Sequence, residues 1–435
     1  MENTIRYSYL DYAAYVFPHP PKSYWDEKPS SSCKWNDFNI YVHVPFCAQL
    51  CHFCHFEKRI VSRELIDIYI KSLFREIRNR SNIDDFDNAS PRSIYFGGGT
   101  ASILSSSRLL AILTELKSSF NLPSDIECTI ECEPKTKRAS ELEKLLKSGF
   151  NRISIGIQSF DDSLLSNLNR RHSAADAIRM VNDAKAAGFT NIHIDLMYGL
   201  PGQTFENWAK TVESAIELKV QHISAYPLFV FSNEPLDQRL SNGKLPPLPQ
   251  YIQVTKMRQY AEKMFHAAGY TAYTMTEYSL PDHQSNYIRS MWDGSDYMGL
   301  GPSALSRNNC TVWENTPFLT KYELSTRQNT LPIGRGKSLS PLQAFARDLS
   351  NGFFGLSVGI DHLEKRYSLS FDEHFGSVFS ALIYEGLIER SGANINLTDQ
   401  GRNYCMKVMR SFCGCDKSFG LSHLNPDLSI KVDLK

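Results

Sequence analysis

Residues 41–59 read YVHVPFCAQLCHFCHFEKR and carry three cysteines, Cys47, Cys51 and Cys54, within eight positions. The letters YVHV predict a strand that ends at Pro45, so the cysteines follow on the loop after it. Three thiolates in this spacing suit three irons of a [4Fe–4S] cluster and leave the fourth iron an open position. The alternative is a structural zinc site, whose fourth ligand would come from a histidine of the same segment: His43, His52 or His55.

Strands and helices alternate on both sides of this segment. Helical spacing of apolar residues predicts a helix over 62–78, and Ser140 with Glu143 and Ser173 with Asp176 predict capping boxes that open two further helices. Short runs rich in β-branched residues predict six strands, at 40–44, 93–96, 126–132, 152–157, 191–197 and 221–228. Repeated βα units imply parallel strands joined by right-handed crossovers, so we expect an α/β fold and favour an open or closed barrel over a sandwich.

The pattern of elements also predicts how the chain divides. Residues 1–39 are expected to form an irregular N-terminal arm, 40–310 the barrel, 311–345 a linker, and 346–435 a winged-helix-like C-terminal domain. Within the last of these, Ser370 and Glu373 predict the start of a helix. The polar, Pro-rich segment 232–250 is expected to be a loop or lid over one end of the barrel.

Composition narrows the class of protein. Lysine plus arginine and aspartate plus glutamate both number 47 in 435 residues, which argues against a general nucleic-acid or membrane-surface role. The start of the sequence lacks the pattern of a secretory signal, and no apolar stretch approaches the length of a membrane span, so we expect a soluble cytoplasmic protein. In a reducing compartment the ten cysteines are free, catalytic or metal-bound.

Polar residues stand at the ends of successive predicted strands. The run Gly97–Thr100 (GGGT) follows one strand directly, and glycines let backbone amides approach a ligand closely. Glu131, Gln158 and Asp195 stand late in the next three strands. The carboxyl ends of barrel strands surround one pocket, so we expect these side chains to share it.

Six motifs, in order and spacing, resemble the HemN/HemW family of radical S-adenosylmethionine (SAM) enzymes, the family of oxygen-independent coproporphyrinogen III oxidases. They are YVHVPFC, YFGGGT, RISIGIQSF, NRRH, DLMYGLPGQT and MGLGPSALS, between Tyr41 and Ser306. The resemblance implies a partial (β/α)6 barrel with a helical or winged C-terminal domain. It also implies a [4Fe–4S] cluster that reduces SAM to a 5′-deoxyadenosyl radical, and an electron donor such as flavodoxin or ferredoxin.

The resemblance further implies two SAM sites. The cluster-bound SAM would contact Tyr41, Gly98 and Glu131, with Leu305 beside its adenine and Phe229 as an additional candidate. The second SAM would be held by a larger set: Phe53, Gly99, Thr100, Gln158, Arg170 and Asp195.

Two positions depart from the family pattern. Coproporphyrinogen oxidases carry a further cysteine where this chain has Phe56, and the heme-chaperone branch carries an acidic residue where it has His55. Both positions resemble class C radical SAM methyltransferases, a branch close to cyclopropanating enzymes and anaerobic heme-degrading methyltransferases. The sequence therefore predicts transfer of a methyl or methylene group from a second SAM to an sp² carbon of a small conjugated substrate. Coproporphyrinogen oxidation, heme trafficking and a structural zinc protein are the alternatives.

Four of the other cysteines are expected to play no part in this chemistry. Cys413 and Cys415 are too few for a second cluster, and Cys128 and Cys132 alternate within a strand as packing residues would.

Overall fold

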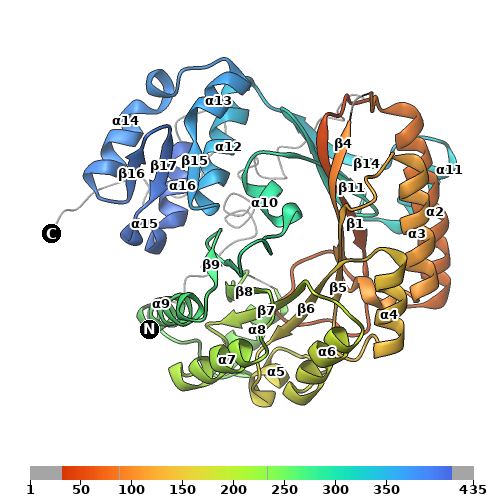
Figure 1. Cartoon of the computed structure of the whole chain (residues 1–435), viewed down its shortest axis with the longest axis horizontal. Coiled ribbons are helices and arrows are strands. Elements are labelled where there is room, and N and C mark those ends of the chain that lie inside the picture. Colours follow the sequence, from red (N-terminus) through yellow and green to blue (C-terminus); the bar gives the residue numbers. More distant parts are fainter. Residues whose placement is uncertain (1–31, 88, 233, 414–435) are drawn as a thin grey trace.

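A curved parallel sheet forms the centre of the protein in the computed structural model, which describes residues 32–87, 89–232 and 234–413. Six parallel strands are neighbours in chain order: β1 (Asp37–Val44), β4 (Ser90–Gly98), β5 (Glu127–Cys132), β6 (Arg152–Gln158), β7 (Ile192–Tyr198) and β8 (His222–Pro227). The helices between them lie on the outer side of the sheet (Figure 1): α2 (Arg63–Ile83), α3 (Ser106–Ser119), α4 (Ala139–Ser148), α5 (Asp162–Asn167), α6 (Ala174–Ala186) and α7 (Phe205–Glu217). The expected partial (β/α)6 barrel is confirmed.

Local signals decide where the helices begin. Ser62 caps α2 by accepting from the backbone N–H of Leu65, and the predicted capping box of Ser173 and Asp176 opens α6. The capping box predicted for Ser140 and Glu143 is wrong. Helix α4 begins earlier, because the Glu141 carboxylate accepts from the backbone N–H of Arg138 at 3.2 Å.

The sheet continues beyond the six units at both edges. Next to β1 lie β11 (Asp296–Leu300), which is parallel to it, and then the antiparallel strands β12 (Leu305–Asn308), β13 (Thr311–Asn315) and β14 (Ile333–Ser338). Next to β8 lie β10 (Glu277–Ser279) and β9 (Thr271–Ala272).

Two segments expected to be irregular therefore contain regular structure. Residues 311–345 hold β13, α11 (Leu319–Arg327) and β14 instead of a linker, because β13 buries Trp313 completely while it pairs on both sides. The segment 232–250 includes α8 (Pro235–Ser241), with a proline in its first turn, where a missing N–H costs nothing. Helix α9 (Tyr251–Ala267) follows it.

The C-terminal part has its own apolar core, built from residues between Leu339 and Phe412. It contains α12 (Pro341–Phe354), β15 (Ser357–Gly359), α13 (Ile360–Tyr367), α14 (Phe371–Tyr384), β16 (Ile388–Ser391), β17 (Asn394–Leu397), α15 (Asp399–Asn403) and α16 (Cys405–Cys413). Helices followed by a small antiparallel sheet agree with the winged-helix-like plan, and Ser370 caps α14 as predicted. The expectations for residues 1–31 and for the side chains of Cys413 and Cys415 fall outside the described residues.

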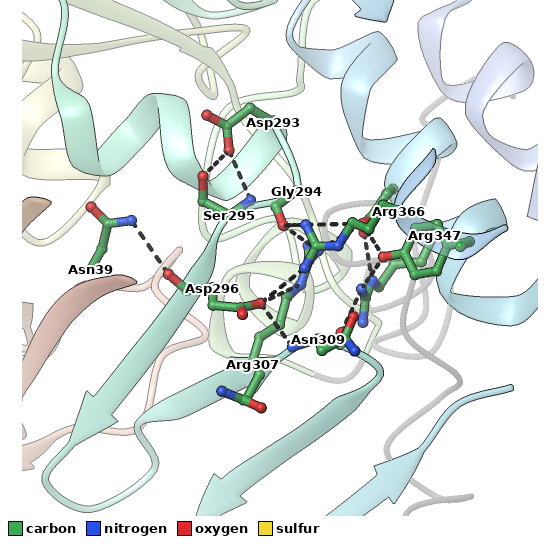
Figure 2. Close-up of polar contacts among 12 residues, drawn as sticks. Asn39, Asp293, Gly294, Ser295, Asp296, Arg307, Asn309, Arg347 and Arg366 are labelled. Carbon is green, nitrogen blue, oxygen red and sulfur yellow. Dashed lines mark hydrogen bonds and ion pairs between the residues drawn. The ribbon is translucent and has the colours of Figure 1, made fainter. Parts of the chain in front are cut away.

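Buried charges join the barrel to the C-terminal part (Figure 2). Asp348 of α12 pairs with Arg307 of β12 at 2.7 Å and with its neighbour Arg347 at 2.8 Å. Arg366 of α13 pairs with Asp296 of β11 at 3.2 Å. Three arginines thus share two carboxylates at this junction. Among the helices of the described residues, none has the length and apolar character that crossing a membrane requires.

Candidate active site

The three cysteines lie on a loop that the chain closes immediately after β1. Two short parallel strands, β2 (Phe46–Cys47) and β3 (Arg59–Ile60), bring the two ends of the loop together. The backbone N–H of Arg59 donates to the carbonyl of Pro45 at 2.7 Å, and that of Val61 donates to the carbonyl of Cys47 at 3.0 Å. The loop therefore holds Cys51 and Cys54 beside Cys47 at the carboxyl end of β1.

Each thiol has a polar neighbour. Thr100 Oγ1 donates to Cys47 Sγ at 3.8 Å, Arg170 Nη1 donates to Cys51 Sγ at 3.3 Å, and Lys58 Nζ donates to the carbonyl oxygen of Cys54 at 2.5 Å. Burial raises the pKa of Cys47 to about 11, with smaller contributions from the neighbouring Cys54 and Cys51 and an opposing one from the Thr100 hydrogen bond. A cationic metal centre would stabilise these groups as thiolates, the form in which cysteine binds a metal.

The histidines of this segment are engaged elsewhere. The ring nitrogens of His43 lie 3.2 Å from Tyr41 Oη and 3.1 Å from the carbonyl oxygen of Glu57. His52 Nδ1 lies 3.3 Å from the carbonyl oxygen of Asn167, and the His55 ring packs 4.7 Å from that of Phe231. These contacts fit three thiolates on a cluster better than a Cys₃His zinc site.

The spacing of the sulfurs points the same way. Sulfurs that share one zinc ion stand about 3.8 Å apart, given Zn–S bonds of about 2.3 Å. Within the described residues, one group of three metal-ligating side chains has all its ligand atoms within 4.8 Å of one another, namely His193, His222 and Glu277. The three cysteines do not form such a group, so at least two of their sulfurs lie farther apart than 4.8 Å, which is too far for one shared zinc ion.

The glycine run at the end of β4 lets the barrel strands approach the loop that carries Cys47, Cys51 and Cys54, here called the cluster loop. A Cβ on Gly99 would lie 2.7 Å from the carbonyl oxygen of Phe46 and 2.9 Å from Cys47 Sγ. A Cβ on Gly97 would lie 3.0 Å from side-chain atoms of both Glu131 and Tyr41. Side chains at these two positions would therefore displace both the cysteine and the carboxylate.

The residues predicted for the first SAM lie on neighbouring strands. Tyr41 and Glu131 meet across Gly97, and Tyr95 Oη donates to Glu131 Oε1 at 2.8 Å. Burial, followed by the charge of Asp195, raises the pKa of Glu131 to about 8. Leu305 lies farther along the sheet, with its carbonyl oxygen against Gly299, the residue of β11 that pairs with Tyr41.

Three of the residues predicted for the second SAM surround Gly156 of β6. A Cβ there would meet Gln158 Nε2 at 3.1 Å and Arg170 Nη2 at 3.6 Å, and Gly156 pairs with Asp195 of β7. Gln158 has a φ of 69° at a bulge in β6, which turns its side chain toward Gly156. Burial raises the pKa of Asp195 to about 6.

The remaining predicted residues approach from the cluster side. Thr100 and Gly99 lie against Cys47, as described above. Phe53 packs against a small apolar cluster that includes Met197 of β7 and Leu200 just after that strand. Phe229 is half-buried directly after β8. The fold thus gathers the predicted residues around the carboxyl ends of the barrel strands.

Sequence reasoning missed several buried polar residues inside the barrel. Glu133 pairs with Arg170 at 3.5 Å. Arg152, His193, His222 and Glu277 lie deeper and contact one another. The alternation in IHID places His193 on the same face as Asp195 and could have identified it. Glu277 belongs to a three-residue strand and carries no comparable signal.

Comparisons with known proteins agree with this geometry. A family model described as the radical SAM superfamily matches residues 41–215. The heme chaperone HemW of Lactococcus lactis is 30% identical over 397 residues, which cover 90% of this chain and 100% of that protein. The oxygen-independent coproporphyrinogen III oxidase of Salmonella typhimurium is 28% identical over 399 residues, covering 87% of this chain and 84% of that protein.

Among solved structures, coproporphyrinogen III oxidase (HemN) from Escherichia coli superposes with a TM-score of 0.75 at 24% identity. The match covers 94% of this chain and 93% of that one, so the two proteins share the whole fold. Three thiolates without a histidine ligand fit the [4Fe–4S] cluster on which radical SAM enzymes bind and reduce SAM. The chain belongs to the HemN/HemW family of radical SAM enzymes.

Proposed function

We propose that this enzyme generates a 5′-deoxyadenosyl radical at the cluster held by Cys47, Cys51 and Cys54 and directs it at a tetrapyrrole. The observation that carries the proposal is the three-thiol loop, which faces buried carboxylates at the carboxyl ends of the barrel strands. The named relatives support the substrate class, because one is a heme chaperone and the other a coproporphyrinogen oxidase.

The side chains divide into two groups in this proposal. Tyr41, Gly98 and Glu131 hold the SAM that the cluster activates, and Leu305 borders its adenine. The second SAM is held near Gly156, where the Arg170 guanidinium pairs with its carboxylate and the Asp195 carboxylate attracts its cationic groups. The other members of the second group are Phe53, Gly99, Thr100 and Gln158.

The relatives favour one reaction first, the oxidative decarboxylation of coproporphyrinogen III. In that reaction two propionate side chains lose CO2 and become vinyl groups. The HemW relative supports an alternative to this reaction, in which the protein binds heme without converting it.

A second reaction is favoured by Phe56. Coproporphyrinogen oxidases carry a cysteine at this position, whereas the resemblance to class C methyltransferases implies transfer of a methyl or methylene group to an sp² carbon. Phe56 is half exposed, and its ring packs against that of His55 at a tilt, with centroids 4.4 Å apart. The second residue after Cys54 therefore offers an aromatic surface in place of a thiol.

One experiment separates these reactions. The reconstituted protein is incubated anaerobically with SAM and a low-potential electron carrier of the flavodoxin or ferredoxin type, which we propose as its cytoplasmic partner. Coproporphyrinogen III and heme are offered separately. Release of CO2 with 5′-deoxyadenosine supports decarboxylation, and S-adenosylhomocysteine formed together with 5′-deoxyadenosine supports methyl transfer. Stoichiometric heme binding without either product supports the chaperone role, and no reaction or binding with either tetrapyrrole contradicts the substrate class.

A further inference from the structure

A buried group of ligand-type side chains inside the barrel has no part in the proposal above. His193 of β7, His222 of β8 and Glu277 of β10 are each at most 2% exposed, and their ligand atoms lie within 4.8 Å of one another. Two histidines and a carboxylate are a common donor set for zinc or iron. The hydrogen bonds around the group decide whether a metal could bind there.

The hydrogen on His222 can be assigned from its neighbours. Arg152 Nη2 lies 2.9 Å from His222 Nδ1, and a guanidinium can only donate, so Nδ1 accepts. The hydrogen of the neutral ring is therefore on Nε2, which lies 2.8 Å from Tyr273 Oη and 3.4 Å from Glu277 Oε2. Burial and the charges of His193 and Arg152 hold the pKa of His222 well below its usual range, which keeps the ring neutral.

The same reasoning applies to His193. Its Nδ1 is buried and has no partner among the described residues, so a hydrogen placed there would have no acceptor. Its Nε2 lies 2.5 Å from Ser224 Oγ and 3.1 Å from Asp195 Oδ1. Ser224 donates its own hydrogen to Glu277, so the hydrogen of His193 Nε2 is directed at Asp195 and at the Ser224 oxygen.

These assignments argue against a metal ion. A metal bound to both Nε2 atoms would force both hydrogens onto Nδ1, where His193 has no acceptor and His222 faces the Arg152 donors. Metal-bound histidines in proteins usually donate from the other ring nitrogen to an acceptor, which is the opposite arrangement.

The network instead supplies hydrogen bonds to two carboxylates. Glu277 accepts from Ser224 and from Tyr226 Oη, the latter at 2.6 Å. Asp195 accepts from Ser154 Oγ at 3.1 Å on one oxygen and from His193 on the other. We propose that His193 is a positioning residue, whose Nε2–H fixes the Asp195 carboxylate in the orientation and charge state that the second SAM requires. This inference rests on the proposed role of Asp195 in the second SAM site.

The test measures SAM binding alone. Cluster-loaded protein without reductant or substrate is titrated with SAM by equilibrium dialysis, and the stoichiometry and the affinity of the weaker site are compared among variants. His193→Leu removes the donor, and we expect the weaker site to lose about ten- to hundred-fold in affinity, as for a lost hydrogen bond to a charged group. His193→Gln retains an N–H near the Nε2 position and should stay within about threefold of the wild type.

Two further variants serve as controls. Ile194→Val alters the buried residue on the opposite face of β7 and should leave both sites unchanged. Ser154→Ala removes the Ser154 donor to Asp195 with little change in volume, and should weaken the same site. It takes the place of His193→Leu in the test if that variant does not fold.

The pH dependence adds a readout that a merely structural role would not give. The charged and polar groups around Asp195 come from several elements: Tyr95 of β4, Glu131 of β5, Arg152 and Ser154 of β6, Arg170 of the loop before α6, His193 on the same strand, Ser224 and Tyr226 of β8, and Glu277 of β10. Loss of the His193 donor leaves these other groups in place and should raise the pKa of the Asp195 carboxyl. As pH falls, the weaker SAM site should therefore lose affinity at a higher pH in His193→Leu than in the wild type.

Several results would overturn the inference. His193→Leu with two SAM sites of wild-type affinity would do so, as would a His193→Gln variant as weak as His193→Leu. Cobalt(II) bound by wild-type apoprotein but not by His193→Leu would identify a metal site instead. A wild-type protein that binds one SAM only would overturn the proposed second SAM site as well, so the two failures are distinguishable.

Discussion

The Arg170 guanidinium donates to the sulfur of Cys51 across 3.3 Å. Another nitrogen of the same side chain donates to the carbonyl of Gly156 at 2.7 Å and lies 3.5 Å from Glu133. One largely buried arginine thus connects a proposed cluster ligand with the strand that carries Gln158. From this position its charge would act on both the proposed cluster and the proposed second SAM.

Replacing this arginine should change the reduction potential of the cluster. Reduction adds negative charge, which the Arg170 cation stabilises, and hydrogen bonds to cluster sulfurs raise the potential. Arg170→Gln should therefore lower the potential by about 40 mV, which corresponds to about 1 kcal/mol for one electron. A potentiometric titration followed by electron paramagnetic resonance measures it. The neighbouring Arg171 is exposed, so Arg171→Gln should leave the potential unchanged, and equal potentials in the two variants would contradict the role of Arg170.

The cluster loop should not tolerate a side chain at Gly99. The added Cβ would meet a backbone oxygen of Phe46 and the sulfur of Cys47, neither of which can move without opening the loop. Gly99→Ala should destabilise the protein by about 1–3 kcal/mol, as overpacking does, and lower its iron content after reconstitution. Gly376→Ala is the matched control, because a Cβ there meets nothing within 4 Å on α14 and should stabilise the helix by about 0.5–1 kcal/mol. Full iron content in Gly99→Ala would show that the contact is not restrictive.

Replacing a cysteine of the loop should abolish cluster binding, whereas replacing a cysteine of the barrel strands should not. Cys54→Ala should leave the protein unable to keep a cluster, because it removes one of the three proposed iron ligands. Cys128 is fully buried in β5, and Cys128→Ala should keep about four irons per chain. Iron analysis with the visible absorption spectrum measures both, and a single bound zinc in the wild type would contradict the cluster.

The barrel and the positions of the proposed SAM contacts could be expected from the sequence because they depend on regular strands. Once 126–132, 152–157 and 191–197 are parallel neighbours, Glu131, Gln158 and Asp195 must lie at the same end of the sheet. The spacing Cys47–Cys51–Cys54 likewise predicts a shared loop without knowledge of its path. Periodicity and local spacing were sufficient for these residues.

Other features depend on contacts between distant segments. His222, Glu277 and Arg152 meet because β10 pairs with β8 in antiparallel fashion, and a three-residue strand leaves no periodic pattern. The extension of the sheet through β13 and β14 likewise depends on pairing between segments, here β12 with β13 and β13 with β14, that no local pattern predicts. The start of α4 was misplaced because Glu141 reaches the N–H of Arg138, a residue that is not a usual helix cap.

Glu131 should make the stability of the SAM-free protein fall with rising pH. Its pKa is raised to about 8 in the folded protein and is about 4.3 when unfolded. Between these values the folded state binds more protons than the unfolded state, so the free energy of unfolding decreases as pH rises. Glu131→Gln has no carboxyl to ionise at this position. Between about pH 6 and about pH 8 its free energy of unfolding should fall by about 2 kcal/mol less than that of the wild type.

Urea denaturation at several pH values measures the effect of Glu131. Asp195 and Glu277, with pKa values raised to about 6 and about 7, give the variant a residual slope of the same sign. Glu389 is exposed on β16, so Glu389→Gln should retain the wild-type slope. Identical slopes in Glu131→Gln and the wild type would show that Glu131 is ionised at no cost.

Asp348 should be the most sensitive residue at the junction between the barrel and the C-terminal part, where it pairs with Arg307 and Arg347. Burial alone would raise its pKa, but the charges of Arg307 and Arg347 hold it well below the usual range. Asp348→Asn would leave these guanidinium groups buried without their carboxylate, which costs about 3–5 kcal/mol. Because the folded pKa is depressed, this stabilisation is present above about pH 4 and is lost as pH falls further. The free energies of unfolding of Asp348→Asn and the wild type should therefore converge in acid.

Asp361 is exposed on α13, and Asp361→Asn should stay within about 0.5 kcal/mol of the wild type at every pH. Urea denaturation near neutral pH measures the difference. An Asp348→Asn variant as stable as Asp361→Asn would show that Arg307, Arg347 and Arg366 can be buried here without the Asp348 carboxylate.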